Sequence, residues 1–213
     1  MRLDEYLLKR GVRCKETADH LIKRCMVLVN GKPVTYPSLP VEESDKIEIL
    51  KEEYKDAPAS FWKLKEIDKD MKLIQTGDFV LCVESPDGGF PLYAAREEAN
   101  VTLVTVRDDL DFLKKEGVEI KKKNLLREDP KKFLSSKFDT VIIEIGLDIM
   151  KSIQLVEKMR EFVGSRGKLI MFVPEKGREN AREMIENMLL NQKLGVVDFF
   201  ETRKGFYVYA KVV

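Results

Sequence analysis

The chain has 213 residues, enough for one large domain or two smaller ones, and 44% of them are hydrophobic, which allows a buried core. The formal net charge is +1, so nucleic-acid binding would need a local basic patch. The three cysteines lack CxxC spacing, and no apolar run approaches the ~20 residues of a membrane span. We therefore expect a cytoplasmic protein with no disulfide framework, no metal site, no signal peptide and no membrane helix.

The first fifty residues predict a small α+β domain. Apolar residues with helical spacing predict one helix over Leu3–Leu8 and a second over Thr17–Met26. Asn30-Gly31 lies between two short strand-like runs and predicts a β-hairpin, and residues 45–50 predict a further strand. Basic residues gather in the helical half and acidic residues over 42–48. This separation favours a basic surface on the helices, although charge alone is equally compatible with an ordinary solvated face.

The same segment resembles the S4 domain, the RNA-binding domain of ribosomal small-subunit protein four. The resemblance rests on Arg2-Leu3-Asp4, Leu7, Gly11, Ala18, Leu21-Ile22, Val27, Val29-Asn30-Gly31-Lys32, Val34, Pro37, Val41 and Asp45-Lys46-Ile47. It implies binding of structured RNA, ribosomal or transfer RNA, mainly through phosphates and shape. By position, the residues implied to contact RNA are Arg2, Arg13, Lys15, Lys23, Arg24, Asn30 and Lys32.

Residues 51–60 are polar, contain Pro58 and end in small residues, which predicts a linker. We therefore expect one domain at 1–50 and a second at 61–213. In the second domain, alternating strand and helix patterns predict an α/β fold of Rossmann-like methyltransferase type, with a mostly parallel sheet and a C-terminal antiparallel hairpin. The expected helices are 61–72, 91–99, 109–115, 130–135, 148–163 and 178–192, and the expected strands are 79–83, 101–106, 118–121, 140–145, 168–173, 196–202 and 206–213.

The run Phe79–Phe90 changes from an apolar strand to turn-forming residues and then to a helical pattern. This is the layout of a ligand-side loop in an α/β domain, although Gly88-Gly89 without a GxGxxG fingerprint is a weak signal alone. Together with Phe61-Trp62-Lys63-Leu64-Lys65-Glu66-Ile67-Asp68, Leu73-Ile74 and Gly77-Asp78, the run resembles the opening of the FtsJ-like RNA methyltransferases. An S4 domain fused to this fold also resembles the hemolysin-like ribosomal RNA methyltransferases.

The resemblance implies S-adenosylmethionine as cofactor and methylation of ribose 2′-hydroxyls. Gly88, Gly89, Asp108 and Asn124 fall at cofactor-binding positions. Two other cofactor positions depart from the family pattern. Cys82 replaces an acidic residue, and Glu84 replaces a glycine.

The family's catalytic set is Lys, Asp, Lys and Glu, in which a lysine of lowered pKa removes the proton of the 2′-hydroxyl. Lys63 matches the first position and Glu144 the second. Phe172 falls at the base lysine, and Gly205 falls near the final glutamate. A shifted register leaves other candidates for these two roles, namely Lys168, Lys176, Glu175 and Glu201.

These substitutions favour an RNA-binding protein whose methyltransferase-like domain has lost or altered its chemistry. An active S-adenosylmethionine-dependent RNA methyltransferase and a protein-docking scaffold are the alternatives. Lys121-Lys122-Lys123 and Lys131-Lys132 would either extend the RNA surface or be solvated. The sequence does not predict an oligomeric state.

Overall fold

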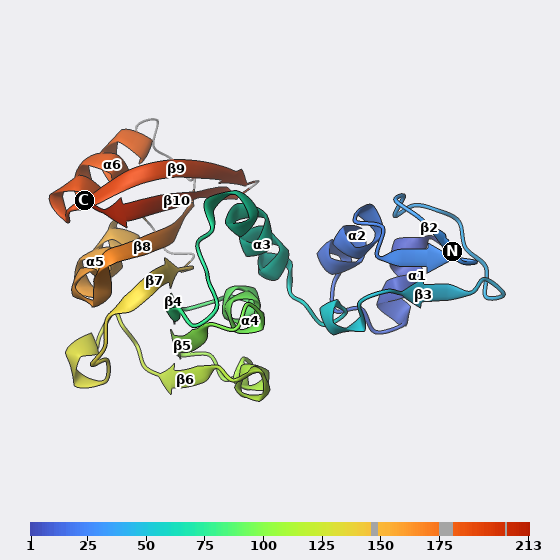
Figure 1. Cartoon of the computed structure of the whole chain (residues 1–213), viewed down its shortest axis with the longest axis horizontal. Helices are drawn as coiled ribbons and strands as arrows, with labels where there is room; N and C mark the ends of the chain where they lie inside the picture. Colours follow the sequence, from blue (N-terminus) through green and yellow to red (C-terminus); the bar gives the residue numbers. More distant parts are fainter. Residues whose placement is uncertain (146–148, 175–180, 203) are drawn as a thin grey trace. The chain divides into compact units, whose positions relative to one another are not determined.

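The computed structural model describes residues 1–145, 149–174, 181–202 and 204–213 (Figure 1). The chain forms two compact units, an N-terminal unit, Met1–Glu66, and a C-terminal unit, Ile67–Val213. The division falls within helix α3, Ala59–Met71. In the described part of the chain, no helix is both long enough and apolar enough to span a membrane. The domain limits 1–50 and 61–213, with a linker between them, stay a prediction.

The N-terminal unit packs two helices against a small antiparallel sheet of strand order β2-β1-β3. Its elements are α1 (Leu3–Lys9), α2 (Lys15–Lys23), β1 (Val27–Val29), β2 (Lys32–Pro33), β3 (Ile47–Ile49) and the 3-10 turn η1 (Glu52–Tyr54). The helices bury Leu3, Leu7, Leu21 and Ile22. Asn30 and Gly31 both have positive φ, +53° and +77°, which is the backbone of the predicted tight hairpin turn.

The C-terminal unit is built on a seven-stranded sheet of order β6-β5-β4-β7-β8-β10-β9. The first five strands in this order run parallel, and β10 pairs antiparallel with both β8 and β9. The predicted C-terminal hairpin is therefore confirmed, with β10 inside the sheet and β9 at its edge. The strands are β4 (Phe79–Val83), β5 (Asn100–Thr105), β6 (Glu119–Lys122), β7 (Phe138–Ile143), β8 (Val163–Pro174), β9 (Leu194–Thr202) and β10 (Gly205–Val212).

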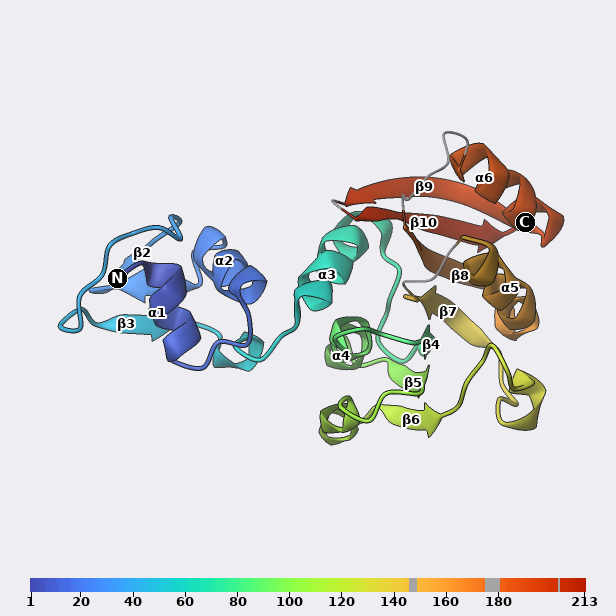
Figure 2. The same cartoon turned by 180° about the vertical axis from the view of Figure 1, so that it is seen from behind.

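Helices cover both faces of this sheet, with α4 on one face and α5 and α6 on the other (Figures 1 and 2). The buried face of α5 repeats at helical spacing, with Ile149, Ile153, Val156 and Met159 packed against the strands. The helical elements are α4 (Gly89–Arg96), α5 (Ile149–Met159), α6 (Ala181–Asn191), and the 3-10 turns η2 (Asp111–Glu116), η3 (Pro130–Lys132) and η4 (Arg160–Phe162).

Candidate functional site

A cavity of about 290 Å³ opens at the carboxyl ends of β4, β5 and β7. The chain leaves β4 toward β5 on one side, and β7 pairs with β4 on the other. This reversal is the switch point where open α/β sheets bind ligands. The residues lining the cavity are Val83, Glu84, Pro86, Val106, Arg107, Asn124, Leu125, Leu126, Glu144, Ile145 and Leu155.

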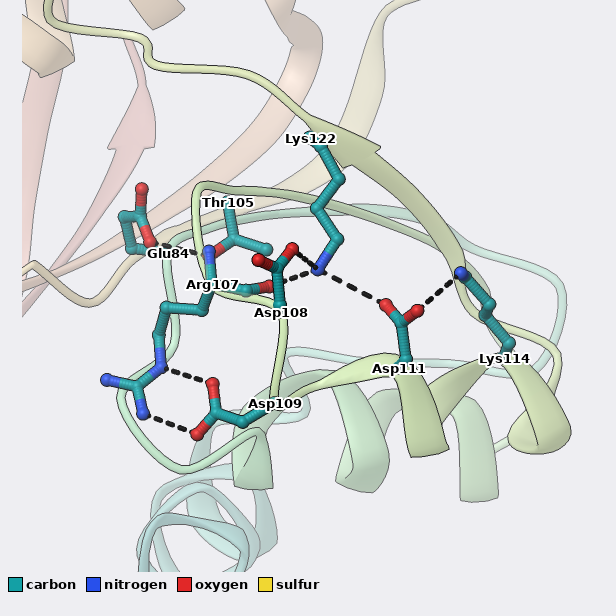
Figure 3. Close-up of polar contacts among 8 residues, drawn as sticks. All are labelled: Glu84, Thr105, Arg107, Asp108, Asp109, Asp111, Lys114 and Lys122. Atoms are coloured by element: carbon teal, nitrogen blue, oxygen red, sulfur yellow. Dashed lines mark hydrogen bonds and ion pairs between the residues drawn. The ribbon is translucent and has the colours of Figure 1, made fainter.

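Glu84 follows the last residue of β4 and has a left-handed backbone, with φ +54°. Its amide N donates to the Val104 carbonyl at 2.9 Å, which fixes the turn against β5. Its carboxylate Oε2 accepts a hydrogen bond of 2.6 Å from Thr105 Oγ1 (Figure 3). Left-handed backbone favours glycine, the residue that the family pattern places here. Glu84 therefore keeps the glycine conformation while adding a carboxylate to the cavity wall.

Glu144 follows β7 and is 6% exposed. Its Oε1 accepts a hydrogen bond of 3.0 Å from the Tyr207 hydroxyl, and its Oε2 accepts one of 3.1 Å from Ser85 Oγ. Burial, together with the nearby Asp87 carboxylate, raises the pKa of Glu144 to about 8 despite these two donors. The side chain is thus mostly an uncharged acid at neutral pH.

Aromatic side chains enclose the Glu144 side of the site. Tyr207 packs against Phe172 at 5.1 Å between ring centroids and against Phe90 at 5.5 Å. Burial and the neighbouring Glu144 raise the pKa of the Tyr207 hydroxyl, so it stays protonated. The position assigned to the base lysine therefore belongs to an aromatic cluster. In this cluster, Phe172 offers no group that accepts a proton.

A chain of ion pairs holds the segment after β5 (Figure 3). The Arg107 guanidinium donates to both oxygens of Asp109, at 3.0 and 2.6 Å. Lys122 Nζ lies 3.2 Å from Asp111 Oδ1 and 3.5 Å from Asp108 Oδ1, and it also donates to the Arg107 carbonyl. The Asp108 side chain is 97% exposed and does not line the cavity. Arg107, one residue earlier, lines the cavity instead.

The two predicted cofactor glycines also lie outside the cavity lining. Gly88 has φ +77°, and a Cβ there would come within 3.1 Å of Leu110 and Phe112. Gly88 thus permits close packing of the start of α4 against the segment around η2. Gly89 N donates to Asp87 Oδ1 at 3.0 Å. Their cofactor role stays a prediction.

Asn124 does line the cavity, as its predicted cofactor role requires. Its Oδ1 accepts from Leu126 N at 3.0 Å, and its backbone N donates to Glu128 Oε1 at 3.0 Å. These bonds fix the loop between β6 and β7. Sequence reasoning missed Ser85, Arg107 and Tyr207. Arg107 immediately precedes Asp108, the residue predicted for the cofactor site, so a shift of one residue in the prediction would have found it.

The catalytic role of the remaining candidates stays a prediction, and the described ones lie as follows. Lys63 lies on α3 in the N-terminal unit and is half-buried. Lys168 Nζ donates to the Leu73 carbonyl at 2.8 Å, and Glu201 pairs with Arg182. Gly205 has φ +151°, and a Cβ there would overlap the Val173 carbonyl oxygen, so a glutamate does not fit. The two further candidates, Glu175 and Lys176, lie outside the described residues.

The residues predicted to contact RNA are all exposed. Arg2 and Asn30 take part in hydrogen bonds of the local fold. Arg2 donates to both oxygens of the buried Asp4 at 3.0 and 2.9 Å, and Asn30 Nδ2 donates to Asp45 Oδ1 at 2.8 Å. The other five define what we call the basic surface, namely Arg13, Lys15, Lys23, Arg24 and Lys32.

Lys23 and Arg24 of the basic surface lie in ion pairs. Lys23 lies 3.6 Å from Asp19, and Arg24 lies 3.4 Å from Glu66. Both cations are exposed, and Asp19 is half-buried while Glu66 is exposed, so the pairs contribute little to stability and phosphates can replace the carboxylates. In the part of the chain that the structure describes, Lys15 and Lys32 have no carboxylate within ion-pair distance. By contrast, lysines of the C-terminal unit are paired, Lys121 with Glu119 at 2.8 Å and Lys131 with Glu161 at 3.1 Å.

The sheet order, the C-terminal hairpin and the cavity at the switch point define a methyltransferase-type Rossmann domain. The FtsJ-like methyltransferase family model matches residues 59–203, and the S4 domain model matches residues 1–47. The chain belongs to the FtsJ-like methyltransferase family and begins with an S4 domain. These two matches support an RNA-binding, methyltransferase-like protein and make S-adenosylmethionine a plausible ligand.

Solved structures share this fold at low sequence identity. A protein named as a hemolysin from Streptococcus thermophilus has a TM-score of 0.65 at 14% identity, covering 100% of this chain and 88% of that one. Its counterpart from Lactococcus lactis scores 0.62 at 16% identity, covering 73% and 88%. A protein named as an rRNA methylase from Clostridium thermocellum scores 0.54 at 16% identity, covering 71% and 97%. No curated protein matches the sequence significantly.

Proposed function

We propose that this protein binds structured RNA through the basic surface and that its C-terminal unit does not transfer methyl groups to ribose 2′-hydroxyls. The binding proposal rests on five exposed basic side chains on and around α2. Two of them, Lys15 and Lys32, have no carboxylate partner among the described residues. Exposed cations of this kind bind phosphates with little loss of existing interactions. A-form RNA favours such phosphate and shape recognition over base reading.

Phe172 and Gly205 support the second half of the proposal. Phe172 cannot accept a proton, and the backbone at Gly205 leaves no room for a longer side chain. Burial raises the pKa of Glu144 to about 8 and so favours its uncharged form, which makes it a weaker partner for a catalytic lysine ammonium. With a phenylalanine at the base position, the residue there leaves the proton on a 2′-hydroxyl, which is then a weak nucleophile.

The cavity itself fits S-adenosylmethionine in its chemistry. Val106 and Leu126 offer apolar contacts to a purine, Asn124 offers an amide, and Glu84 offers a carboxylate to a cation. When bound, this cofactor supplies an activated methyl group. An active RNA methyltransferase is therefore the second candidate, and the cavity is the observation that favours it.

Filter binding of a structured ribosomal RNA fragment at two salt concentrations tests the binding proposal. Replacing Lys15→Ala and Lys32→Ala together should weaken binding about tenfold. The slope of log affinity against log salt concentration should become shallower by about two, because two phosphate contacts are lost. The matched control is Lys46→Ala with Lys69→Ala, two exposed lysines outside the basic surface. Equal affinity and slope for the two double variants would exclude the basic surface as the RNA site.

A further inference from the structure

The polar side chains that line the cavity differ in charge and in whether a charged partner lies beside them. Four such residues line it, Glu84, Arg107, Asn124 and Glu144. Asn124 is neutral. The positive charge of Arg107 is balanced by the Asp109 carboxylate, to which the guanidinium donates two hydrogen bonds. Glu144 is buried, flanked by the hydroxyls of Ser85 and Tyr207, and stays protonated at neutral pH. Glu84 is therefore the lining carboxylate that is neither deeply buried nor in an ion pair among the described residues, and the Arg107 guanidinium acts on it only from beyond ion-pair distance.

The surroundings of Glu84 hold its carboxylate in place without an ion-pair contact. Thr105 Oγ1 donates to the carboxylate at 2.6 Å, and the backbone N of Glu84 is fixed to β5. A neutral hydroxyl orients a carboxylate and leaves its charge intact. Among the residues that the structure describes, no cation lies within ion-pair distance of Glu84. The Arg107 guanidinium, the nearest candidate in the lining, is occupied by Asp109.

The rest of the wall is apolar and partly open. Val106 is 55% exposed and Leu126 is 38% exposed, while Leu155 is fully buried. Exposed apolar side chains at a cavity are stabilised when an apolar group of a ligand covers them. The cavity thus combines a place for an apolar group with one fixed negative charge.

We propose that Glu84 is a specificity residue that makes this cavity select organic cations, ligands of nucleoside size that place a positive charge beside the end of β4. The selection comes from attraction between the carboxylate and the ligand's cation in a partly buried site, where charges interact more strongly than in water. A ligand of the same framework without the sulfonium cation lacks this attraction. This inference concerns the C-terminal unit alone and does not depend on RNA binding.

Calorimetric titration of the full chain with two matched probes tests the proposal. S-adenosylmethionine carries a sulfonium cation. S-adenosylhomocysteine lacks the methyl group and this charge but keeps the α-ammonium and carboxylate groups, so the pair isolates the attraction between Glu84 and the sulfonium. At pH 7 the wild type should bind the sulfonium probe about tenfold more tightly. In Glu84→Gln, which keeps a hydrogen-bond acceptor for Thr105, the two affinities should agree within about twofold.

Glu98→Gln is the matched control. Glu98 is also a glutamate with left-handed backbone, φ +62°, but it is exposed and lies before β5, at the opposite end of that strand. This variant should keep the wild-type preference. Equal binding of both probes by the wild type, an unchanged preference in Glu84→Gln, or no binding of either probe up to about 1 mM would overturn the proposal.

A second variant guards against misfolding of the first. Glu84→Gly places the residue best suited to the left-handed backbone at this position, so the fold is retained while the carboxylate is removed. It should lose the preference as Glu84→Gln does. Retention of the tenfold preference in folded Glu84→Gly, checked by circular dichroism, would also overturn the proposal. RNA binding measured in parallel should be unchanged in both variants, which separates this test from that of the basic surface.

Discussion

The basic surface and the cavity use charged residues in different physical settings. On the basic surface the side chains are exposed, so each keeps its charge whatever its neighbours, and function depends on how many cations face one way. In the cavity two glutamates follow adjacent strands, yet Glu84 is a charged side chain while Glu144 is a buried acid with its pKa raised to about 8. On the basic surface, the residue type alone tells which side chains are charged. In the cavity, burial decides whether a glutamate is charged.

The comparison implies that substitutions in the C-terminal unit alter stability and that those on the basic surface do not. Gly205→Ala should have the largest effect, about 3 kcal/mol or more of destabilisation. Its φ is +151°, and a Cβ would overlap the Val173 carbonyl oxygen, so β10 must move away from β8. Urea unfolding monitored by circular dichroism measures the change. Gly31→Ala is the control, because no atom lies within 4 Å of its Cβ position and only the backbone cost applies.

Glu144→Gln should change how stability depends on pH. The ordinary pKa of 4.5 applies to the unfolded chain and about 8 to the folded one, so between these values the folded state holds a proton that the unfolded state has lost. Wild-type stability therefore falls as pH rises, by about 1.4 kcal/mol per pH unit from this group, and levels off above pH 8. The variant lacks this slope. Unfolding at pH 5 and pH 9 should show the difference between the two proteins changing by roughly 4 kcal/mol.

Glu119→Gln is the matched control for this pH effect. Lys121 lowers the pKa of Glu119, so this carboxylate is ionised in both states over the same range and its removal should add no slope between pH 5 and pH 9. A wild-type stability that is flat across this range, parallel to that of Glu144→Gln, would show that Glu144 is not buried as an uncharged acid.

The two left-handed glutamates should respond differently to glycine. Glu98→Gly relieves backbone strain and should stabilise the fold by about 1 kcal/mol. Glu84→Gly relieves the same strain but loses the hydrogen bond from Thr105, so its stability should stay within about 0.5 kcal/mol of the wild type. Thermal unfolding of the two variants in one buffer compares them. An equal gain in both would mean that the Thr105 bond contributes nothing.

The smallest effect is expected on the basic surface. Lys15→Ala with Lys32→Ala should change the free energy of unfolding by less than about 0.5 kcal/mol, because both side chains are exposed and make no ion pair among the described residues. Chemical denaturation checks this. A loss of more than about 1 kcal/mol would show that these lysines support the fold, and weaker RNA binding by the variant would then have a structural cause.

The sequence predicted elements better than it predicted side-chain environments. The strand at 79–83 and the hairpin at Asn30-Gly31 have strong local signals, alternation or apolar runs ending in turn residues, and both are present as predicted. The cavity lining depends on register and on contacts between distant segments. A shift of one residue separates Asp108, which is exposed, from Arg107, which lines the cavity.

The environment of Glu144 could not be predicted from the sequence either. The sequence pattern placed Glu144 inside a strand at 140–145, whereas β7 ends at Ile143. Its raised pKa follows from burial and from the nearby Asp87 carboxylate, and its hydrogen bonds come from Tyr207, 63 residues later in the chain, and from Ser85 on the neighbouring strand end. No local pattern reports such a contact. The left-handed backbone of Glu84 was likewise hidden, because a glutamate gives no signal for positive φ.

The central claim is that the protein binds structured RNA without methylating ribose. The most direct measurement incubates bound ribosomal RNA with S-adenosylmethionine labelled in the methyl group and then digests the RNA to nucleosides. The account predicts saturable RNA binding with no labelled 2′-O-methylnucleoside above a protein-free control. A labelled 2′-O-methylnucleoside that accumulates with time, and is absent when the RNA is omitted, would contradict it.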